Sequence, residues 1–552
     1  MSAGAEASAG AGLASRILPC GDRALLVQVD ALEQALAAHA ALAATAPDGV
    51  LELVPAARTV LVRLDPRVLG LTHAEHWLRS ALADADPGAP LPEGPLVDLP
   101  LVYDGDDLEA VAALWGCSPA EVVERHARTE WRCAFVGFAP GFPYLVPAEP
   151  TEALLPLPRR ATSRPVVPAG AVALAAEYTG VYPRSSPGGW HLIGRTDAVL
   201  WDARRDPPAF VPPGARVRFV PVRALGAAAS TVAGAAASAV ASAVASAEPA
   251  APAPPVAAGR AIELVDPEAL TLVQDLGRSG RAALGVGAAG AFDRAAHRLA
   301  NRLVGNDEAA AALEVLLGGL TLALPAGAWV AVTGGSGPVS LDGASVPPRT
   351  AVRAERDGAL LRLGRLDAGL RATVAVRGGV DAPLELGSRS RDTLSGIGPD
   401  PIAAGGILAI GDAIAGPVPS VDLVPVDLPG DGPLDLAVRP GPRRDWFAAE
   451  AWRTLLDAEW RVSPRSDRTG VRLEGPALER AAAASGRELP SEGMLPGSIQ
   501  VSPDGAPTIL GPDAPVTGGY PVIAVVADAA LDSLAQARPG QAVRLRLATG
   551  RP

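Results

Sequence analysis

The 552-residue sequence contains no lysine, because all 48 of its basic residues are arginine. Biotin and lipoyl groups are attached to lysine side chains, so this chain carries neither group as a swinging arm. A Schiff-base lysine and the lysine of a standard P-loop are excluded for the same reason. Any basic side chain that contacts a phosphate or a carboxylate must therefore be an arginine.

Cysteine and histidine are also scarce, with three and six residues respectively. Cys20, Cys117 and Cys133 are too few and too widely spaced for a disulfide framework or a zinc site. The histidines form no HExxH motif, and no metal site is predicted. The net charge of −12 argues against binding to nucleic acid, which requires a basic surface.

Long runs of leucine, isoleucine or phenylalanine are missing as well. Residues 224–247 carry no charge over a membrane-spanning length, but they are mainly alanine, serine and glycine and run into a proline-rich stretch. This composition favours an Ala/Pro-rich linker over 224–259, and residues 1–15 are typical of a disordered tail. The sequence therefore predicts a cytoplasmic protein with no membrane partner.

The linker divides the chain into two halves that are both rich in β-like patterns. Residues 16–95 combine strand and helix periodicity, and residues 96–223 continue with short apolar runs broken by glycine and proline. The second half divides into 260–435 and 436–552, with one strong helical pattern over 292–305. The predicted fold class is α+β and β-rich, with barrel units in both halves and a small N-terminal α+β domain.

A glycine-containing turn block recurs three times in each half, in the same order. The block glycines are Gly170, Gly188 and Gly214 in the first half and Gly497, Gly518 and Gly540 in the second. The separations are 18 and 26 residues in the first half and 21 and 22 in the second. We therefore predict related β-barrels in the two halves, with a composite cleft where they meet.

Aromatic residues make up only 4% of the chain, yet four of them fall within residues 135–144. One interpretation is a rigid Pro-Gly turn capped by core aromatics. The other is an aromatic pocket wall beside exposed backbone N–H groups, which the PGGW sequence at 187–190 favours. His126, at the end of a predicted helix, is either a structural histidine or an acid/base catalyst.

Two glycine-rich loops lie near the start of the second half. QDLGRSG, at 274–280, predicts either a turn held by Asp275 and Arg278 or an arginine that clamps a carboxylate or a phosphate. GVGAAG, at 285–290, matches GxGxxG but lacks the buried strand that a dinucleotide site requires before it. The helix that follows, from about Phe292, still offers free N–H groups to an anion.

Longer motifs resemble a known enzyme family. FVGFAPGFPYL, PRRATSRPVVPAGAVAL and TGVYPRSSPGGWHLIGRT in the first half resemble the B subunit of prokaryotic ATP-dependent 5-oxoprolinase, also described as KipI or allophanate-hydrolase-like subunit 1. TLVQDLGRSGR, GAFDRAAHRLANRLVGN, LGSRSRD, SDRTGVRLEG and TGGYPVIAVV in the second half resemble the C subunit, the carboxyltransferase-like KipA family. The chain as a whole is similar to a B–C fusion.

The resemblance implies a fold, a reaction and a partner. It implies cyclophilin-like β-barrels in both halves, packed on each other. It implies an ATP-dependent hydrolase that converts 5-oxo-L-proline to L-glutamate by phosphorylating the lactam carbonyl, together with a separate A subunit. ATP and Mg²⁺ are the implied cofactors, no biotin is attached to this chain, and a homo-oligomer is left open.

Motif positions, together with His126, give the candidate site residues, and none of them is predicted as a metal ligand. The catalytic candidates are Asp275, Arg278, Asp293 and His126. The substrate-binding candidates are Phe138, Gly141, Tyr144, Arg164, Tyr182, Gly189, Trp190, Arg195, Asn301, Glu314, Ser388, Arg389, Arg468, Arg472, Gln500, Asp513 and Tyr520. Asn306 matches a motif position as well.

Four positions depart from the family pattern and leave the exact substrate open. Tyr178 stands where glutamine is usual, Thr373 where tyrosine is usual, Arg391 where threonine is usual and Thr469 where methionine is usual. Two other functions remain as alternatives. The first is a urea-carboxylase-like carboxyltransferase that works with a separate biotin carrier, and the second is a non-enzymatic inhibitor of a sensor histidine kinase.

Overall fold

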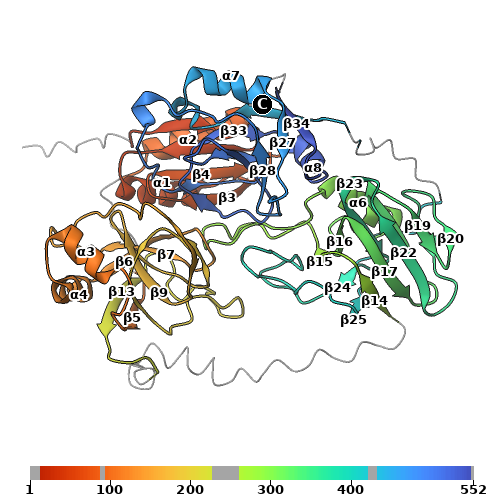
Figure 1. The fold of residues 1–552 in the computed structure, drawn as a ribbon, viewed down its shortest axis with the longest axis horizontal. Coiled ribbons are helices and arrows are strands. Elements are labelled where there is room, and N and C mark those ends of the chain that lie inside the picture. Colours follow the sequence, from red (N-terminus) through yellow and green to blue (C-terminus); the bar gives the residue numbers. More distant parts are fainter. Residues whose placement is uncertain (1–12, 87–93, 227–259, 421–429, 431, 549–552) are drawn as a thin grey trace, which may run out of the picture.

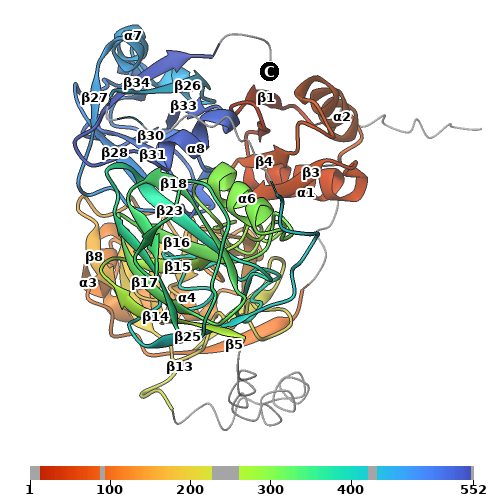
Figure 2. The same cartoon turned by 90° about the vertical axis from the view of Figure 1, so that its right-hand side faces the viewer.

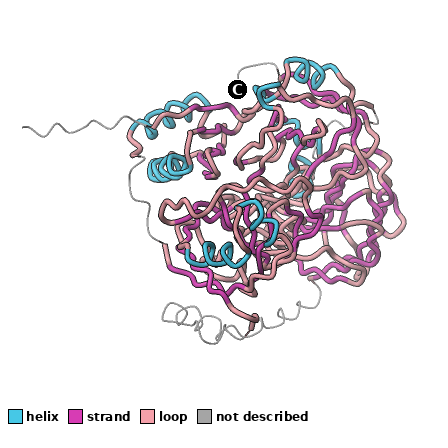
Figure 3. Tube along the Cα trace, turned by 60° about the vertical axis from the view of Figure 1, so that its left-hand side comes forward, coloured by secondary structure: helices cyan, strands magenta, loops and turns pink. Residues whose placement is uncertain are grey.

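The structure is a computed structural model that describes residues 13–86, 94–226, 260–420, 430 and 432–548. Most of the predicted tail and linker lies outside these residues. The described chain forms four units, two from each half (Figure 1). Strands and loops make up most of the trace, and helices are few (Figure 3). None of the helices in the described part combines the length and the apolarity that crossing a membrane requires.

The N-terminal domain is a four-stranded antiparallel sheet in the order β1-β2-β4-β3, with two helices. Its elements are β1 (Arg16–Pro19), β2 (Ala24–Gln28), α1 (Leu32–Thr45), β3 (Val50–Pro55), β4 (Thr59–Leu64) and α2 (Leu71–Ala83). One face of the sheet packs under the helices, where Leu42 and Leu78 are fully buried. On the other face, Leu26 and Leu61 share a core with Met494 of the C-terminal unit.

Residues 94–226 form a seven-stranded sheet in the order β12-β9-β10-β7-β6-β13-β5. Its main elements are β5 (Leu96–Leu101), α3 (Leu108–Trp115), α4 (Pro119–Arg128), β6 (Trp131–Val136), β7 (Pro143–Pro147), β9 (Ala171–Ala175), β10 (Tyr178–Val181), β12 (His191–Arg195) and β13 (Arg216–Pro221). A short ribbon pairs β8 (Arg164–Val167) with β11 (Ser186–Gly188). The sheet almost closes on itself, because Val102 pairs with Arg195 across its two edges.

The first unit of the second half contains two sheets, one of seven strands and one of five, rather than one closed sheet. Its elements are β14 (Ala261–Pro267), β15 (Thr271–Gln274), α6 (Arg294–Leu303), β16 (Ala312–Leu316), β17 (Gly318–Leu324), β18 (Trp329–Ser336), β19 (Val339–Leu341), β20 (Ala344–Ser345), β21 (Val352–Arg353), β22 (Ala359–Arg365), β23 (Ala368–Val376), β24 (Val380–Asp381) and β25 (Gly406–Ile410). Both sheets contribute to one apolar core, and α6 packs on β18 and β23.

The C-terminal unit is a closed seven-stranded barrel, β26-β33-β30-β31-β28-β27-β34. Its elements are β26 (Leu434–Pro440), η1 (Arg444–Trp446), α7 (Ala449–Asp457), β27 (Trp460–Val462), β28 (Gly470–Glu474), η2 (Ala482–Ala484), β29 (Glu492–Gly493), β30 (Ser498–Val501), β31 (Pro507–Leu510), β32 (Thr517–Gly518), β33 (Val522–Val526), η3 (Asp528–Ala530), α8 (Leu531–Leu534) and β34 (Ala542–Leu547). A large cluster of buried aliphatic residues and Trp460 fills its interior.

The two barrels have the same strand order, which confirms the prediction of related barrel units. Each strand of the first sheet has a counterpart at the same place in the second, and the first and last strands pair in parallel in both. The turn glycines fall at equivalent places too. Gly170 and Gly497 precede β9 and β30, and Gly214 and Gly540 precede β13 and β34, all with φ between 80° and 88°. Side chains with a Cβ avoid this region of φ, so glycine is favoured there.

The N-terminal domain lies against the C-terminal barrel, at the opposite end of the chain (Figure 2). The Arg443 guanidinium pairs with Glu492 and donates to Gln28 Oε1 at 2.7 Å, while Ala57 N donates to Ser491 O at 3.2 Å. The two halves therefore pack against each other and form one body.

Candidate functional site

Loops of the two halves meet along a boundary that we call the seam, formed by residues 136–142, 284–285 and 517–519. The loop between β6 and β7 belongs to the first half. Its Gly141 N donates to Leu284 O at 3.1 Å, and Val136 pairs with Leu284 as an isolated β-bridge. Its Phe138 N donates to Thr517 Oγ1 at 2.7 Å. The seam thus joins the FVGFAPGF motif to the GVGAAG and TGGY motifs of the second half.

Glycine permits the close approach of the backbones at the seam. A Cβ on Gly137 would lie 2.5 Å from Thr517 Oγ1, and a Cβ on Gly285 would collide with Ala139 O. Phe138 itself has a φ of 63°, in the left-handed region that non-glycine residues rarely adopt. Such backbone strain persists only where surrounding contacts fix it, and the bond to Thr517 is one of them.

The aromatic residues of the first half pack behind the seam. Ring centroids lie 4.3 Å apart for Phe135 and Tyr144, and 5.4 Å apart for Phe142 and Trp190. Most of the pairs are edge-to-face, an arrangement that aromatic quadrupoles favour. Because the rings fill the space with one another, the interpretation as an open aromatic pocket is wrong. The cluster is a core, whose polar edge includes Tyr144 Oη at 3.5 Å from Ser491 Oγ.

Asp275 organises the loop at 388–390 in the second half. Its carboxylate accepts hydrogen bonds from Ser388 Oγ at 2.6 Å, Ser390 Oγ at 2.5 Å, Arg389 N at 2.7 Å and Gly277 N at 2.8 Å. A carboxylate with four donors holds both loops in one arrangement. The structure therefore brings Asp275, Ser388 and Arg389 together, as positioning residues for the loop that carries Arg391.

Arg278 is 2% exposed and lies beside the same loop. Its Nη2 donates to Ser390 O, whereas its buried Nε and Nη1 have no hydrogen-bond partner. Burial lowers the pKa of Arg278, and the nearby Asp392 and Asp275 oppose this effect. The guanidinium is not paired with Asp275, so of the two interpretations of this loop the turn held by an Asp275–Arg278 pair is wrong.

Three residues near Arg278 were not among the predicted site residues. Arg184 of the first half lies close to Arg391 and Asp392 of the second, and the charges of both act on it. The signal for Arg184 was its place within the TGVYPRSSPGGW motif. Arg391 and Asp392 close the LGSRSRD motif, and the substitution of the usual threonine by Arg391 was visible in the sequence.

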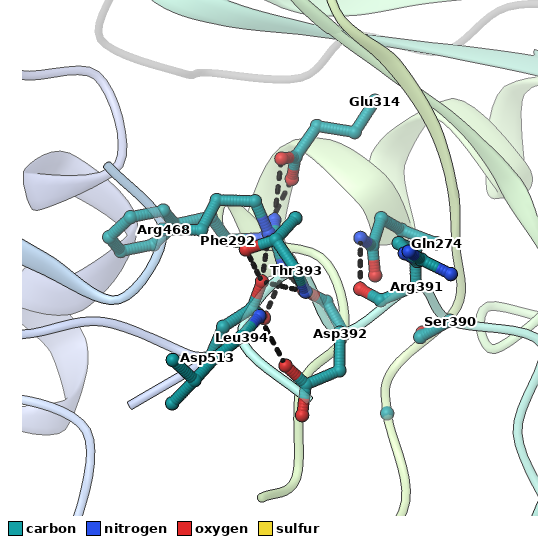
Figure 4. Close-up of polar contacts among 12 residues, drawn as sticks. Gln274, Phe292, Glu314, Ser390, Arg391, Asp392, Thr393, Leu394, Arg468 and Asp513 are labelled. Atoms are coloured by element: carbon teal, nitrogen blue, oxygen red, sulfur yellow. Dashed lines mark hydrogen bonds and ion pairs between the residues drawn. The ribbon is translucent and has the colours of Figure 1, made fainter. Parts of the chain in front are cut away.

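A buried ionic network fixes Asp392 and its neighbours to the C-terminal barrel (Figure 4). Arg468 Nη1 donates to Glu314 at 2.6 Å and its Nη2 to Asp513 at 2.9 Å. Asp513 also accepts from Thr393 N at 2.9 Å. Burial opposes the charge of Arg468, but Asp513 and Glu314 outweigh it and raise the pKa. The predicted residues Glu314, Arg468 and Asp513 therefore lie together and hold the loop in place.

Asp293 and Asn301 occupy structural positions on α6. Asp293 caps the helix, with Oδ1 accepting from Ala296 N at 2.8 Å and Oδ2 from Gln536 at 2.6 Å. Burial raises the pKa of Asp293 to about 6. Asn301 donates to Ala310 O at 2.8 Å and accepts from Asn306 Nδ2 at 2.9 Å. These partners place Asp293 as the cap of the helix, and its catalytic role stays a prediction.

His126 is fully buried in the core of the first barrel. Thr179 Oγ1 donates to Ala173 O at 3.2 Å, so the contact of 3.0 Å between Thr179 and His126 Nε2 makes Nε2 the donor. Nδ1 then accepts from Tyr103 Oη at 2.8 Å. Burial lowers the pKa of His126 to about 3, and the neutral ring is fully bonded. His126 is therefore a structural histidine, and its predicted catalytic role is wrong.

The remaining predicted residues divide into two groups. Tyr182, Gly189 and Trp190 lie in or beside the aromatic core, and Arg164 pairs there with Asp107 at 2.8 Å. The others lie at more open positions and do not join the ionic network. They are Arg195, Arg472, Gln500 and Tyr520.

The described residues are better suited to binding the phosphates of the implied ATP than to binding the implied Mg²⁺. Arg184, Arg278 and Arg391 each have a buried guanidinium nitrogen without a partner, which suits a phosphate. In the same part of the chain, no group of three or more His, Cys, Asp or Glu side chains could hold a metal ion. The structure therefore offers no protein cage for Mg²⁺.

Comparison with known protein families matches each half of the chain to a family model. A family model described as carboxyltransferase domain, subdomain C and D, matches residues 15–211, and one described as carboxyltransferase domain, subdomain A and B, matches residues 284–547. A crystal structure of TTHA0988 is 33% identical, covers 95% of this chain and 99% of its own, and superposes with a TM-score of 0.78. One relative thus carries both halves in a similar arrangement.

Curated relatives match the halves separately. The C subunit of 5-oxoprolinase from Escherichia coli K12 is 38% identical over 50% of this chain and 86% of its own length. The B subunit of 5-oxoprolinase from Escherichia coli O157:H7 is 41% identical over 31% of this chain and 78% of its own length. Saccharomyces cerevisiae urea amidolyase is 33% identical over 51% of this chain, which spans only 16% of that protein. The chain belongs to the carboxyltransferase-domain family that includes the B and C subunits of 5-oxoprolinase, and it joins the two kinds of subunit in one polypeptide.

Proposed function

We propose that the chain is the B–C component of an ATP-dependent 5-oxoprolinase that acts in the cytoplasm with a separate A subunit. The overall reaction is 5-oxo-L-proline + ATP + 2 H₂O to L-glutamate + ADP + phosphate. The seam supports this proposal, because Phe138 of the B-like half and Thr517 of the C-like half share a partly buried hydrogen bond. Subunits that catalyse one reaction together must bring their loops together in this way.

The chemistry explains why ATP is required. A γ-lactam amide is a poor electrophile, and transfer of the γ-phosphoryl group to its carbonyl oxygen, with ADP as leaving group, activates the carbon for attack by water. The ring C–N bond then opens to give an acyl phosphate with a free amino group, and the second water hydrolyses this acyl phosphate to L-glutamate and phosphate. Negative charge develops on oxygen in each step, and buried arginines stabilise such charge. Arg184, Arg278 and Arg391 are the residues that we assign to this task.

The direct test is turnover by the intact chain. ADP and glutamate release from ATP and 5-oxoproline would be measured with the chain alone, with an A subunit alone and with both. We expect release only when both are present, with ADP and glutamate in equal amounts. The reaction without 5-oxoproline is the control for unrelated ATP hydrolysis. Absence of turnover from the folded chain with its A subunit would overturn the proposal.

The similarity to urea amidolyase favours a second candidate function, carboxyl transfer from biotin on another chain. The same preparation would be supplied with urea, a carboxylated biotin carrier and no ATP. Urea-dependent loss of carboxybiotin would support this second function in place of the first. If neither reaction occurs, binding to a sensor histidine kinase becomes the function to test.

A further inference from the structure

An open space bounded by two arginines lies where the two halves meet at Gly396. A Cβ placed on Gly396 would lie 4.0 Å from Arg184 Nη1 and 4.0 Å from Arg391 Nη2. Apart from Gly396 and its chain neighbours, no other heavy atom of the described residues lies within 4 Å of that point. Two guanidiniums, one from each half, therefore border the same unfilled space.

Some of the donors beside this space have no partner, although Arg391 Nη1 donates to Gly396 O and Gly398 O. Arg184 Nη1 and Arg391 Nε are buried without a hydrogen bond, and so are Nε and Nη1 of Arg278, which bonds to Ser390 O next to Arg391. A buried N–H group on a charged side chain is strongly unfavourable unless a partner reaches it. Arg278 meets this condition most fully, because it is 2% exposed. The cluster thus needs an acceptor that the described residues do not supply.

Protein carboxylates do not fill that role. Among the described residues, neither Arg184 nor Arg278 forms an ion pair, and Arg391 pairs only with the exposed Asp400 at 3.0 Å. Asp392 lies close by, but its Oδ1 accepts from Leu394 N and Ser395 N at 2.9 Å each. One oxygen of Asp392 is therefore engaged by its own turn, and its carboxylate acts on Arg184 and Arg278 through charge without forming an ion pair with either of them.

We propose that Arg184 and Arg391 form an oxyanion subsite shared by the two halves, next to the buried Arg278 that holds Ser390 O. The ligand is a planar or tetrahedral oxyanion: the carboxylate of a small amide substrate or a phosphoryl group. Guanidinium forks bind both kinds with two parallel hydrogen bonds. This inference rests on the proposed function only in naming 5-oxoproline and phosphate as the sources.

Binding to the intact chain without an A subunit tests the proposal independently of turnover. Isothermal titration calorimetry would use 5-oxoproline, inorganic phosphate and 2-pyrrolidinone, the lactam that lacks the carboxylate. We expect one of the two oxyanions to bind, and 2-pyrrolidinone to bind at least tenfold more weakly. The oxyanion that binds, 5-oxoproline or phosphate, identifies the natural source of the ligand. Absence of binding by both oxyanions would overturn the proposal.

Matched arginine variants assign the binding to the subsite. Arg184→Gln and Arg391→Gln should each weaken oxyanion binding at least tenfold, and Arg184→Lys should restore part of it. Arg204→Gln removes the same charge from an exposed arginine that pairs with Asp202, and should bind as the parent does. Circular dichroism and thermal unfolding verify that each variant is folded. Parent-like binding by both Arg184→Gln and Arg391→Gln would overturn the proposal.

The binding and turnover results separate this inference from the proposed function. Turnover of 5-oxoproline that is unchanged in Arg184→Gln and Arg391→Gln would contradict the subsite and leave the proposed function standing. Arginine-dependent oxyanion binding by a chain that never turns over 5-oxoproline would support the subsite and contradict the proposed function.

Discussion

Trp131 and Trp460 occupy equivalent positions in the two barrels and make the same hydrogen bond. Each begins the second strand of its barrel, and each indole Nε1 donates to the carbonyl five residues earlier, at 3.1 Å to His126 O and 3.0 Å to Leu455 O. Both side chains are at most 1% exposed. The bond joins the end of the preceding helix to the barrel in both halves, so the relationship between the barrels extends to individual side chains.

Replacing either tryptophan with phenylalanine should destabilise the chain. Trp131→Phe and Trp460→Phe each remove a donor from a buried carbonyl, which costs about 1–3 kcal/mol of unfolding free energy, and each leaves a small cavity. Urea unfolding would measure the loss. Trp77→Phe is the control, because its indole bonds to Thr45 at the surface. Equal urea-unfolding midpoints for all three variants would contradict the stabilising role that we assign to the two buried indole hydrogen bonds.

Thr517→Val should weaken the seam while preserving the shape of the side chain. The variant leaves Phe138 N without its acceptor, at a backbone position that is already strained. We expect a loss of about 1–3 kcal/mol in unfolding free energy and slower turnover with the A subunit. Thr350→Val, at an exposed threonine, is the matched control. A Thr517→Val enzyme with the stability and rate of that control would show that the contact is dispensable.

His126 should make stability fall in acid. Its pKa is about 3 in the fold against 6.5 for the free side chain, because burial disfavours the charged ring. The neutral His126 ring contributes its full share of the unfolding free energy above pH 6.5. This contribution is lost as pH falls towards 3, and the loss is roughly 5 kcal/mol in total. Urea unfolding across this range would be compared for the parent and His126→Gln. Other groups titrate in both proteins, so the difference between the two curves reports His126, and parallel curves would contradict the expectation.

Much of the fold could be predicted from repeated turn glycines. The blocks around Gly170 and Gly497 precede equivalent strands, since glycine is favoured at these turns where φ is positive. Serine followed by proline is a helix-start signal, and Ser118 caps α4, where its Oγ accepts from Glu121 N at 3.2 Å. The two-sheet form of residues 260–435 was not predictable, because strand periodicity indicates which face is buried and not which strands pair.

The candidate site was only partly predictable. Asp275 and Arg278 share a short motif, so they were recognised together, but their separate partners depend on the loop at 388–390, more than a hundred residues away. Arg184 and Arg391 come from different halves, and only the packing of the first barrel against the two-sheet unit of the second half places them around Gly396. His126 was ambiguous because burial, rather than sequence, decides whether a histidine titrates near neutral pH.

Asp275→Asn should disturb the loop that carries Arg391 without touching the arginines. An asparagine has one acceptor oxygen, and its amide nitrogen would face a donor among Ser388 Oγ, Ser390 Oγ, Arg389 N and Gly277 N. We expect at least a tenfold loss of both turnover and oxyanion affinity, with a fall of a few degrees in Tm.

Asp381→Asn is the matched control for this variant, because Asp381 lies outside the loop and contacts only the Arg389 side chain, at 2.9 Å in an exposed ion pair. It should leave oxyanion affinity unchanged. The affinity measurement separates positioning of the loop from simple stability. An Asp275→Asn protein that is less stable but binds the oxyanion as the parent does would limit Asp275 to a structural role. If affinity falls while stability is kept, the four hydrogen bonds of Asp275 set the position of Arg391.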